Sequence, residues 1–472
     1  MSLKFQPLLG VLLFSVSVIG SACGASDDPV AGGSPSAQAD RPNFIFIITD
    51  DQRWDAMGVV QEEQDDQALF PWLQTPHMDR LASQGARFRN AFVVHSLCSP
   101  SRASFLSGQQ TYQHGVRHNS QPMPLDLPSW ATALRDAGYE TGYFGKWHMG
   151  RQRKRPGFTT VFSYVGQGIY QDCVFLDNGN KAPTRGWVDD VTTDHAIDYI
   201  KANKEQPFGM VIGYKSPHEP RKPPARRSND YTDAELIKPA SYMVIPPFRP
   251  AGYKPLNWRS RIHDRKNYFR CITAIDDCLG RILDTLDQTG LTENTVVIFV
   301  GDNGYFLGEH ALHDKRYAYE ESLRIPLLVR YPKMIKPGTL IDAMALNIDL
   351  APTILELAGL GALPDMTGKS WVPVLQDPMA GIERESFLYE NYRDPEFPKV
   401  TFDLFALRTA TMKLITYPGH AEWSELFDLS RDPLELTNII DRPGFASDRE
   451  TLVRQLEAAL RTAGLEPVLT SE

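Results

Sequence analysis

The sequence lacks the features that mark fibrous, disordered and membrane-spanning proteins. Its 34 glycines and 35 prolines among 472 residues are too few for a collagen-like or low-complexity chain. No apolar run is long enough to span a membrane, and there is no internal repeat. Positive charge is not in excess, because 58 Asp and Glu outnumber 49 Lys and Arg. We therefore expect a folded, enzyme-sized protein with no nucleic-acid partner.

Cysteine is also scarce, with five residues in the whole chain. This number is too small for a disulfide framework in an exported protein of this size, so stability must come from the core. Cys271 and Cys278 lie two helical turns apart in a segment with an apolar face, and we expect both to line the core rather than form a disulfide. The sequence suggests no partner or role for Cys173.

The N-terminus has the layout of a secretory signal, which we assign to residues 1–23. One lysine precedes a short apolar run that ends in IGSAC, similar to the box that carries the lipidated cysteine of bacterial lipoproteins. We expect export to the bacterial periplasm, outer membrane or cell surface, with membrane contact only through a lipid on Cys23. The alternative is an ordinary cleaved signal in which Cys23 has no role. Residues 24–40, poor in apolar side chains, are predicted to be a flexible linker.

Short apolar runs that alternate with helical patterns predict an α/β fold. The runs cover residues 44–48, 141–145, 208–214 and 296–301. Because they are apolar on both faces, they favour a large mixed or mainly parallel sheet with helices on both sides. We assign residues 41–385 to this catalytic domain. A hairpin pattern at 404–419 and a helical pattern at 449–463 predict a smaller C-terminal α+β subdomain over residues 386–472.

Polar residues follow each of the four runs, where ligand sites of α/β sheets form. They are Asp50 and Asp51, Lys146 and His148, Lys215 and His218, and Asp302 and Asn303. Three carboxylates and an amide oxygen suit Ca²⁺ or Mg²⁺ rather than Zn²⁺. Either acidic pair alone is more typical of a turn, so the prediction of a metal depends on their coming together.

The segment LCSPSRASFLSG places Cys98 near Arg102 and before Gly108. A thiol next to an arginine is a candidate nucleophile, since the guanidinium lowers a thiol pKa or stabilises an anion. His95 is near in sequence, which does not establish a Cys/His pair. The residues alone leave the role of Cys98 open.

The chain strongly resembles the formylglycine-dependent sulfatases of the alkaline phosphatase superfamily. The Cys98-x-Pro-Ser-Arg string with Gly108 is similar to the signature that directs oxidation of the cysteine to an aldehyde. The other matching strings follow in the family's order across nearly all of the mature chain: PNFIFIITDD, GYFGKWHMG, SPHEP, GDNGYFLGEHALHDK, RIPLLVRYP and ELFDLSRDPLELTN.

This resemblance implies a mechanism for each part of the site. Cys98 would become formylglycine, whose hydrate attacks the sulfur of a sulfate ester and then expels sulfate by C–O cleavage. One Ca²⁺, in preference to Mg²⁺, would be held by Asp50, Asp51, the modified Cys98, Asp302 and Asn303. A formylglycine-generating enzyme or an anaerobic sulfatase-maturing enzyme would be a required partner.

The same resemblance assigns roles to the cationic residues. Arg102, Lys146 and Lys315 would supply positive charge to the transition state. His148 would remove the proton whose loss expels sulfate, and His218 would protonate the departing oxygen. Outside this set, His310 and His313 could touch the substrate, or His310 could brace the loop that presents Lys315. Asp349 is expected to cap a helix.

Several segments suggest a sulfated carbohydrate, such as a glycosaminoglycan or an algal polysaccharide, as the substrate. Basic runs at 151–155 and 221–227 follow the His148 and His218 motifs and could dock a polyanion, although such runs are usually solvated. Residues 166–172 resemble a segment of relatives that act on sulfated sugars, and aromatic residues in 389–405 could wall the pocket.

Two other functions remain open at this point. A phosphomonoesterase or phosphodiesterase of the same superfamily would need a second metal and further His and Asp ligands. A catalytically silent carbohydrate-binding lipoprotein becomes the better interpretation if Cys98 is never modified.

Overall fold

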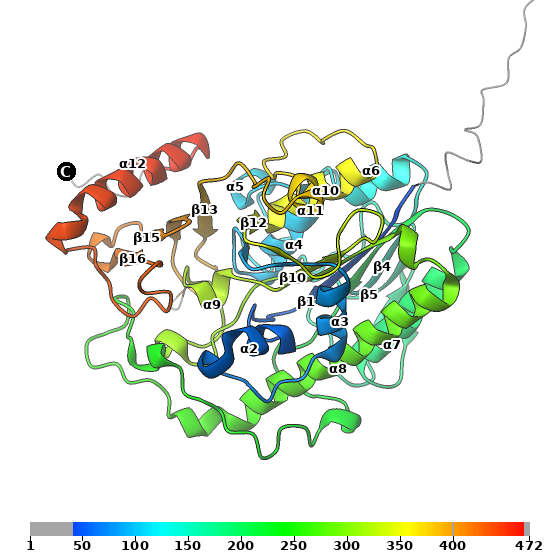
Figure 1. The fold of residues 1–472 in the computed structure, drawn as a ribbon, viewed down its shortest axis with the longest axis horizontal. Coiled ribbons are helices and arrows are strands. Elements are labelled where there is room, and N and C mark those ends of the chain that lie inside the picture. The colour runs from blue at the N-terminus through cyan, green and yellow to red at the C-terminus, as the bar shows by residue number, and fades with distance from the viewer. Residues whose placement is uncertain (1–40, 399–400, 467–472) are drawn as a thin grey trace, which may run out of the picture.

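The computed structural model describes residues 41–398 and 401–466 (Figure 1). The predicted signal peptide, the lipidation site at Cys23 and the linker lie outside the described residues. The centre of the fold is a ten-stranded mixed sheet with the strand order β11-β2-β10-β9-β1-β8-β4-β5-β6-β7. Its strands are β1 (Asn43–Thr49), β2 (Ala86–Phe88), β4 (Glu140–Lys146), β5 (Thr160–Tyr164), β6 (Val174–Asp177), β7 (Asn180–Pro183), β8 (Phe208–Gly213), β9 (Thr295–Gly301), β10 (Leu327–Arg330) and β11 (Thr339–Ile341).

The four predicted apolar runs form β1, β4, β8 and β9, which confirms the α/β prediction. These strands are neighbours, and β9-β1, β1-β8, β8-β4 and β4-β5 all pair in parallel. Antiparallel pairing occurs toward the sheet edges, where β10 joins β9 and β6 joins β5. The parallel centre therefore carries its carboxyl-terminal strand ends along one edge.

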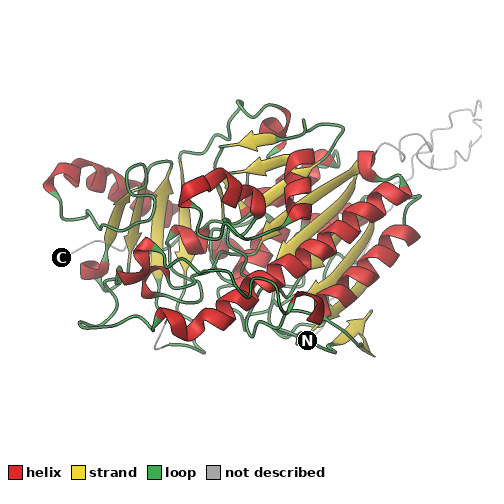
Figure 2. Ribbon diagram, turned by 60° about the horizontal axis from the view of Figure 1, so that its bottom comes forward, coloured by secondary structure: helices red, strands yellow, loops and turns green. Residues whose placement is uncertain are grey.

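Apolar side chains of β1 alternate between two cores, one on each face of the sheet. Ile45 and Ile47 belong to one core and Phe44 and Phe46 to the other. The first core is covered by α2 (Gly58–Gln64), α3 (Pro76–Gln84), α7 (Val188–Ala202) and α8 (Ile262–Thr289). The second is covered by α4 (Cys98–Ser107), α6 (Trp130–Asp136), α10 (Leu350–Leu357) and α11 (Val372–Gln376). Figure 2 shows helices on both faces of the sheet. This arrangement confirms the prediction of a sheet with helices on both sides.

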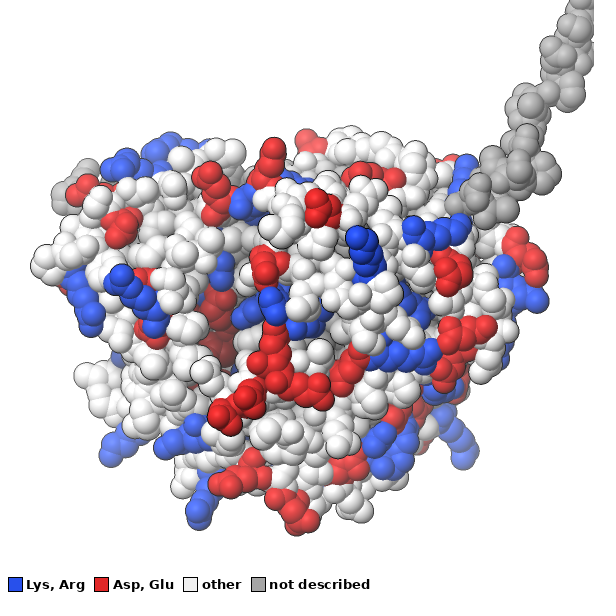
Figure 3. All heavy atoms as spheres, in the orientation of Figure 1, with Lys and Arg blue, Asp and Glu red and all other residues white. Residues whose placement is uncertain are grey.

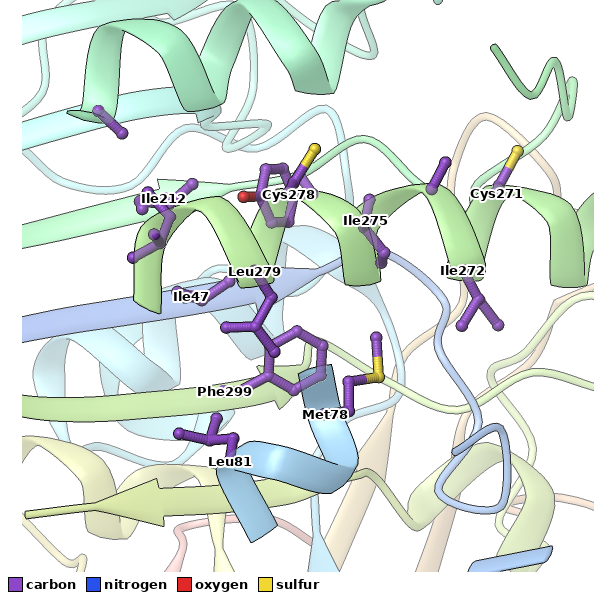
Figure 4. Packing of buried hydrophobic residues seen from close by; sticks show 14 of the residues in the cluster. Ile47, Met78, Leu81, Ile212, Cys271, Ile272, Ile275, Cys278, Leu279 and Phe299 are labelled. Atoms are coloured by element: carbon purple, nitrogen blue, oxygen red, sulfur yellow. The ribbon is translucent and has the colours of Figure 1, made fainter. Parts of the chain in front are cut away.

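Cys271 and Cys278 lie on the buried face of α8, as predicted. Both side chains are fully buried, and Figure 4 shows them in the cluster that contains Ile47 and Phe299 of the sheet. Both thiols are free, and so is Cys173, which is buried in the same core. The described cysteines therefore contribute packing and no disulfide.

The C-terminal part forms a separate antiparallel sheet with the order β13-β14-β15-β16. The strands are β13 (Ser386–Asn391), β14 (Leu404–Thr409), β15 (Met412–Thr416) and β16 (Glu425–Asp428), and α12 (Ala446–Thr462) covers one face. The other face packs on the main body through Phe387 and Ala406 (Figure 2). The hairpin and the terminal helix confirm the predicted elements, whereas the domain boundary at residue 386 stays a prediction.

The remaining strands and α-helices of the described residues are short. They are β3 (Ala91–Phe92) and β12 (Ala345–Leu346), which pair in parallel, and the helices α5 (Thr111–His114) and α9 (Glu320–Leu323). Within the described residues, no helix is both long and apolar enough to cross a membrane.

Candidate active site

The predicted site residues come together at the carboxyl-terminal edge of the parallel strands. Asp50 and Asp51 follow β1, and Asp302 and Asn303 follow β9. Because β1 and β9 are paired in register from Asn43 with Thr295 to Thr49 with Gly301, the two acidic turns lie side by side. The backbone N–H of Asp51 donates to Oδ1 of Asp302 at 3.0 Å. This local geometry holds three carboxylates in one buried cluster.

The cluster suits a hard divalent cation. Ligand atoms of Asp50, Asp51, Cys98 and Asp302 all lie within 4.8 Å of one another. Asn303 donates its Nδ2 to Asp51 Oδ1 at 2.7 Å. Its Oδ1 is buried and accepts no hydrogen bond from the described residues. Buried carboxylate oxygens and a free amide oxygen form the donor set that Ca²⁺ and Mg²⁺ prefer.

Each of the three carboxylates is paired with a different cation. The three pairs are Lys146 with Asp50, Lys315 with Asp51 at 2.6 Å and Arg102 with Asp302 at 2.9 Å. All six side chains are buried, so these pairs are little screened by solvent. The predicted catalytic lysines and arginine therefore lie at the same site as the predicted metal ligands.

The pKa values of the carboxyl groups reflect this competition between burial and charge. Burial favours the protonated form of Asp50, but Lys146 and the other cations hold its pKa well below the ordinary value. Burial and the neighbouring charge of Asp50 raise the pKa of Asp302 to about 7. Burial opposes the charge of Lys315, yet Asp51 raises the pKa of its ammonium well above the ordinary value. Asp50 is therefore held ionised by the neighbouring cations, whereas Asp302 keeps its proton up to a pH of about 7.

Cys98 begins helix α4 and lies next to the acidic cluster. Its Sγ lies 3.2 Å from Oδ1 of Asp50, and the side chain is fully buried. Burial and the charge of Asp50 raise the pKa of the thiol well above its ordinary value. Arg102, which could lower a thiol pKa or stabilise an anion, is bound to Asp302 and the carbonyl of Lys146, and burial and Asp50 outweigh the nearby positive charge at the thiol. An unmodified Cys98 is therefore a protonated thiol and a poor nucleophile.

Glycines at two strand ends position Lys146. Gly145 has a φ of +86°, and a Cβ there would lie 2.1 Å from the carbonyl oxygen of Gly213. A Cβ on Gly213 would in turn lie 2.4 Å from the carbonyl oxygen of Lys146. The close approach of β4 and β8 therefore requires both glycines. It brings the Lys146 ammonium to Asp50.

The two predicted histidines border the same site. His218 Nε2 lies 3.9 Å from Oδ2 of Asp51, and its Nδ1 contacts the carbonyl oxygen of Glu219 at 2.6 Å. Because a carbonyl oxygen can only accept, Nδ1 carries a proton and donates it to this oxygen. Nε2 then points toward the site. His148 is buried with a φ of +47°, and its Nδ1 has no hydrogen-bond partner among the described residues. Burial lowers the pKa of both imidazoles below the ordinary value.

Two residues that the sequence analysis did not select also contact the site. Gln167 Oε1 accepts a hydrogen bond from the ammonium of Lys146 at 2.5 Å. Asp189, in the first turn of α7, accepts the backbone N–H groups of Lys215 and Ser216 at 2.8 and 3.1 Å. It therefore fixes the turn that leads to His218. Gln167 lies in the 166–172 segment that had suggested a sugar substrate. The sequence therefore indicated this segment, but it did not indicate a contact between Gln167 and Lys146.

The arginines of the basic run at 221–227, one of the two candidate docking surfaces for a polyanion, are paired with acidic side chains. Arg221 is paired with Asp264, and Arg226 and Arg227 are both paired with Asp277. In the run at 151–155, Arg153 and Lys154 line a groove of about 600 Å³ and stay candidates for polyanion contact. On the face shown in Figure 3, basic and acidic side chains are mixed, with an acidic stripe near the centre.

Other predicted residues have structural contacts. His310 is fully buried, stacks on Tyr319 at 4.2 Å and faces Glu321, as expected of a bracing residue. Asp349 precedes α10, but its side chain does not cap that helix and instead binds Arg384 and the Leu346 N–H.

One aromatic residue of the C-terminal sheet reaches the loops of the site. The hydroxyl of Tyr389 accepts the N–H of Ser96 and donates to the carbonyl of Arg316. These two partners lie close in sequence to Cys98 and Lys315. The C-terminal sheet is therefore in contact with the segments that carry both residues.

Comparison with known proteins gives one consistent result. The sequence model described as Sulfatase matches residues 42–360, and that of N-sulphoglucosamine sulphohydrolase, C-terminal, matches residues 308–462. The chain is 30% identical to an N-acetylglucosamine-6-O-sulfatase of Bacteroides thetaiotaomicron, over 88% of this chain and 86% of that protein. It is 28% identical to an ulvan-active sulfatase of Formosa agariphila, over 89% and 80% of the two chains. A structure solved in complex with its substrate, D-glucosamine-2-N,6-O-disulfate, superimposes with a TM-score of 0.81 at 28% identity, over 91% of this chain and all 100% of the other.

Proposed function

Because the chain belongs to the sulfatase family of the alkaline phosphatase superfamily, we propose that it removes sulfate from a sulfated carbohydrate through a formylglycine formed at Cys98. The observation that carries the proposal is the buried group around Cys98, in which three carboxylates each pair with a different cation. Such a group can hold a cation and a sulfate side by side. The protein is an enzyme of the sulfatase class, whereas its formylglycine mechanism and its carbohydrate substrate are proposals.

Conversion of Cys98 to an aldehyde fits its surroundings. The raised thiol pKa makes the unmodified side chain a poor nucleophile at neutral pH. The hydrated formylglycine would supply one hydroxyl to attack sulfur, which breaks the S–O bond to the sugar oxygen. Deprotonation of the second hydroxyl would then break the C–O bond to the bound sulfate and restore the aldehyde. A formylglycine-generating or anaerobic sulfatase-maturing enzyme would be the partner that carries out the oxidation.

One Ca²⁺ ion would be held by Asp50, Asp51, Asp302, Asn303 and the modified Cys98. The support is the all-oxygen donor set of the unmodified residues and the buried, unpaired Oδ1 of Asn303 within the described chain. When bound, the ion supplies positive charge to a sulfate oxygen and to the nucleophile.

The remaining residues would neutralise charge and move protons. Lys146 and Lys315 face the carboxylate cluster with their ammonium groups, where they would bind the oxygens of the sulfate. His218 would act as the acid in its doubly protonated form, which the carboxylates of Asp50 and Asp51 favour against burial. One proton would be held on Nδ1 by the Glu219 carbonyl, and the other would be given from Nε2 to the departing sugar oxygen. His148 would accept the proton whose loss releases sulfate.

A carbohydrate substrate is supported by the relatives. One is an N-acetylglucosamine-6-O-sulfatase, another is an ulvan-active sulfatase, and a third was solved with a disulfated glucosamine. Tyr389 is fully buried, so it links the C-terminal sheet to the loops of the site without lining a surface that a sugar could reach. We further propose export of the enzyme with a lipid on Cys23, which mass spectrometry of the mature N-terminus would test.

Mass spectrometry of the tryptic peptide from Asn90 to Arg102, combined with a sulfate-release assay, tests the function. We expect the mass of an aldehyde in place of the Cys98 thiol, and loss of nearly all turnover in Cys98→Ala. The tryptic peptide from Cys271 to Arg281, which contains both Cys271 and Cys278, serves as the unmodified control. An unmodified thiol in active enzyme would rule out the mechanism. An unmodified thiol in protein that binds sulfated sugars without turnover would favour the silent binding protein.

A further inference from the structure

Lys215 is a buried cation without an acceptor. It lies two residues after the end of β8, its side chain is 1% exposed, and its Nζ donates no hydrogen bond to any described residue. Its near neighbour is the ring of Tyr170, whose centroid lies 4.9 Å from Nζ. By contrast, Arg102, Lys146 and Lys315 each donate to a carboxylate. Lys215 is therefore the cation of this site that the protein leaves unpaired.

An unpaired buried ammonium is costly, because it loses water and gains no counter-charge. The face of an aromatic ring recovers only part of that loss. Burial and the charge of Lys146 lower the pKa of Lys215 to about 8. An anion placed beside Lys215 would remove the cost and hold the amine fully charged. A ligand is the natural source of that anion, since the described protein provides none in hydrogen-bond range.

The charges of the site leave room for two anions. Four cations, Arg102, Lys146, Lys215 and Lys315, are balanced by four carboxylates, Asp50, Asp51, Asp189 and Asp302. A divalent ion would add two positive charges, and a sulfate ester carries one negative charge. One further negative charge would then make the occupied site neutral.

Lys215 also lies on the side of the site that would face the sugar. It leaves the same strand end as His218, and Tyr170 connects the two. The Tyr170 ring faces the ammonium of Lys215, and its hydroxyl donates to the carbonyl oxygen of His218 at 2.7 Å. Tyr170 is preceded by Ile169, which is 59% exposed, so the segment that covers Lys215 is itself at the surface.

Building on the sulfatase function above, we propose that Lys215 binds a second anionic group of the substrate, next to the sulfate that is removed. The chemical class is an N-sulfonate, a second O-sulfate or a carboxylate on the same or the adjoining sugar. The enzyme would accordingly prefer doubly anionic sugars to singly sulfated ones.

The experiment compares wild type, Lys215→Met and Lys215→Arg on matched pairs of sugars. The pairs are glucosamine-2-N,6-O-disulfate with N-acetylglucosamine 6-sulfate, and N-acetylgalactosamine 4,6-disulfate with its 6-sulfate. Wild type should favour the doubly anionic member of at least one pair by about 10-fold or more in kcat/KM. Lys215→Met should remove that preference and keep kcat/KM for 4-nitrophenyl sulfate within about two-fold of wild type. Lys215→Arg should retain the preference. Lys222→Met, an exposed lysine nearby, is the control.

Two results would overturn the proposal. One is wild type without preference in either pair. The other is Lys215→Met losing activity equally on 4-nitrophenyl sulfate and on the sugars, with an unchanged Tm, which would place Lys215 on the scissile sulfate. If no sulfate ester is hydrolysed at all, the proposed function fails. The affinities of Cys98→Ala, with and without Lys215→Met, for the same pairs would still decide the role of Lys215.

Discussion

Arg102 and Asp302 lie 200 positions apart in the sequence, and Nε of Arg102 donates to Oδ2 of Asp302 at 2.9 Å. The other carboxylate oxygen accepts the N–H of Asp51 at 3.0 Å. Arg102 also donates to the carbonyl oxygen of Lys146 at 2.8 Å. One guanidinium thus orients a proposed metal ligand and the strand end that carries a catalytic lysine. Partners of this kind commonly determine how well a ligand binds its metal.

Replacing Arg102 with lysine should weaken Ca²⁺ binding by about 10- to 100-fold, because an ammonium cannot satisfy both partners in the same geometry. Titration calorimetry of the metal-stripped proteins would measure the change. Excess Ca²⁺ should restore much of the activity. Arg135→Lys, on the exposed surface of α6, is the control and should bind Ca²⁺ as wild type does. Unchanged affinity with a large loss of kcat would instead place Arg102 directly on the sulfate.

Removal of His218 should affect substrates according to their leaving groups. His218→Ala is expected to slow alkyl and sugar sulfates much more than aryl sulfates, since a phenolate leaves without help from an acid. The measurement is kcat/KM for a series of sulfate esters whose leaving groups differ in pKa. His263→Ala, at an exposed position on α8, should leave the whole series unchanged. Equal losses across the series would contradict the role of His218 as the acid.

Gln167 should matter through Lys146. Its side-chain oxygen accepts from the Lys146 ammonium at 2.5 Å, so Gln167→Ala removes one of the two contacts that fix this group. We expect kcat/KM to fall about 10-fold with an unchanged Tm, in line with the loss of a hydrogen bond to a charged group. Gln171→Ala, an exposed residue of the same segment, is the control. A higher substrate affinity in Gln167→Ala would show that Gln167 competes with the sulfate for Lys146.

Local patterns were sufficient to predict the centre of the fold. The runs that became β1, β4, β8 and β9 are apolar on both faces, which is a property of neighbouring residues in the sequence. The polar residues that follow these strands converge because parallel strands end at a common edge of the sheet. The position of β10, which pairs antiparallel with β9, depends on contacts with Ala86 and Arg87 of β2 far away in the sequence. No local pattern encodes such a register.

The residues of the site divide in the same way into those that local sequence predicts and those that depend on contacts between distant segments. Asp50, Asp51, Asp302 and Asn303 could be predicted from strand ends, and Cys98 and Lys315 only from the family resemblance. Gln167 and Asp189 were missed because their importance arises from tertiary contacts: one lies in a glycine-rich loop and the other resembles an ordinary acidic residue of a first helical turn. The ion pairs of the arginines in the run at 221–227 could not be predicted for a related reason. Its acidic partners come from α7 and α8, so the sequence shows the positive charge without its neutralisation.

Glu390 is a buried acid away from the proposed metal ligands, and it makes stability depend on pH. It lies in β13, and its Oε2 accepts the hydroxyl of Tyr392 at 2.6 Å. Its Oε1 has no hydrogen-bond partner among the described residues. Burial raises the pKa of Glu390 to about 7 from an ordinary value of 4.5. The folded state therefore keeps the proton at pH values where the unfolded state has lost it.

From this shift we predict how Glu390→Gln changes the free energy of unfolding. A raised folded pKa gives stability that is fully present below pH 4.5 and is lost as pH rises to about 7. Glutamine cannot ionise, so the variant should gain about 2 kcal/mol relative to wild type between pH 5 and pH 8. Urea unfolding of both proteins at the two pH values measures this difference. The exposed Glu385→Gln should show no such gain. If Glu390→Gln gave the same difference from wild type at both pH values, the carboxyl group would have an ordinary pKa, and the hydrogen bond to Tyr392 would act on an already charged side chain.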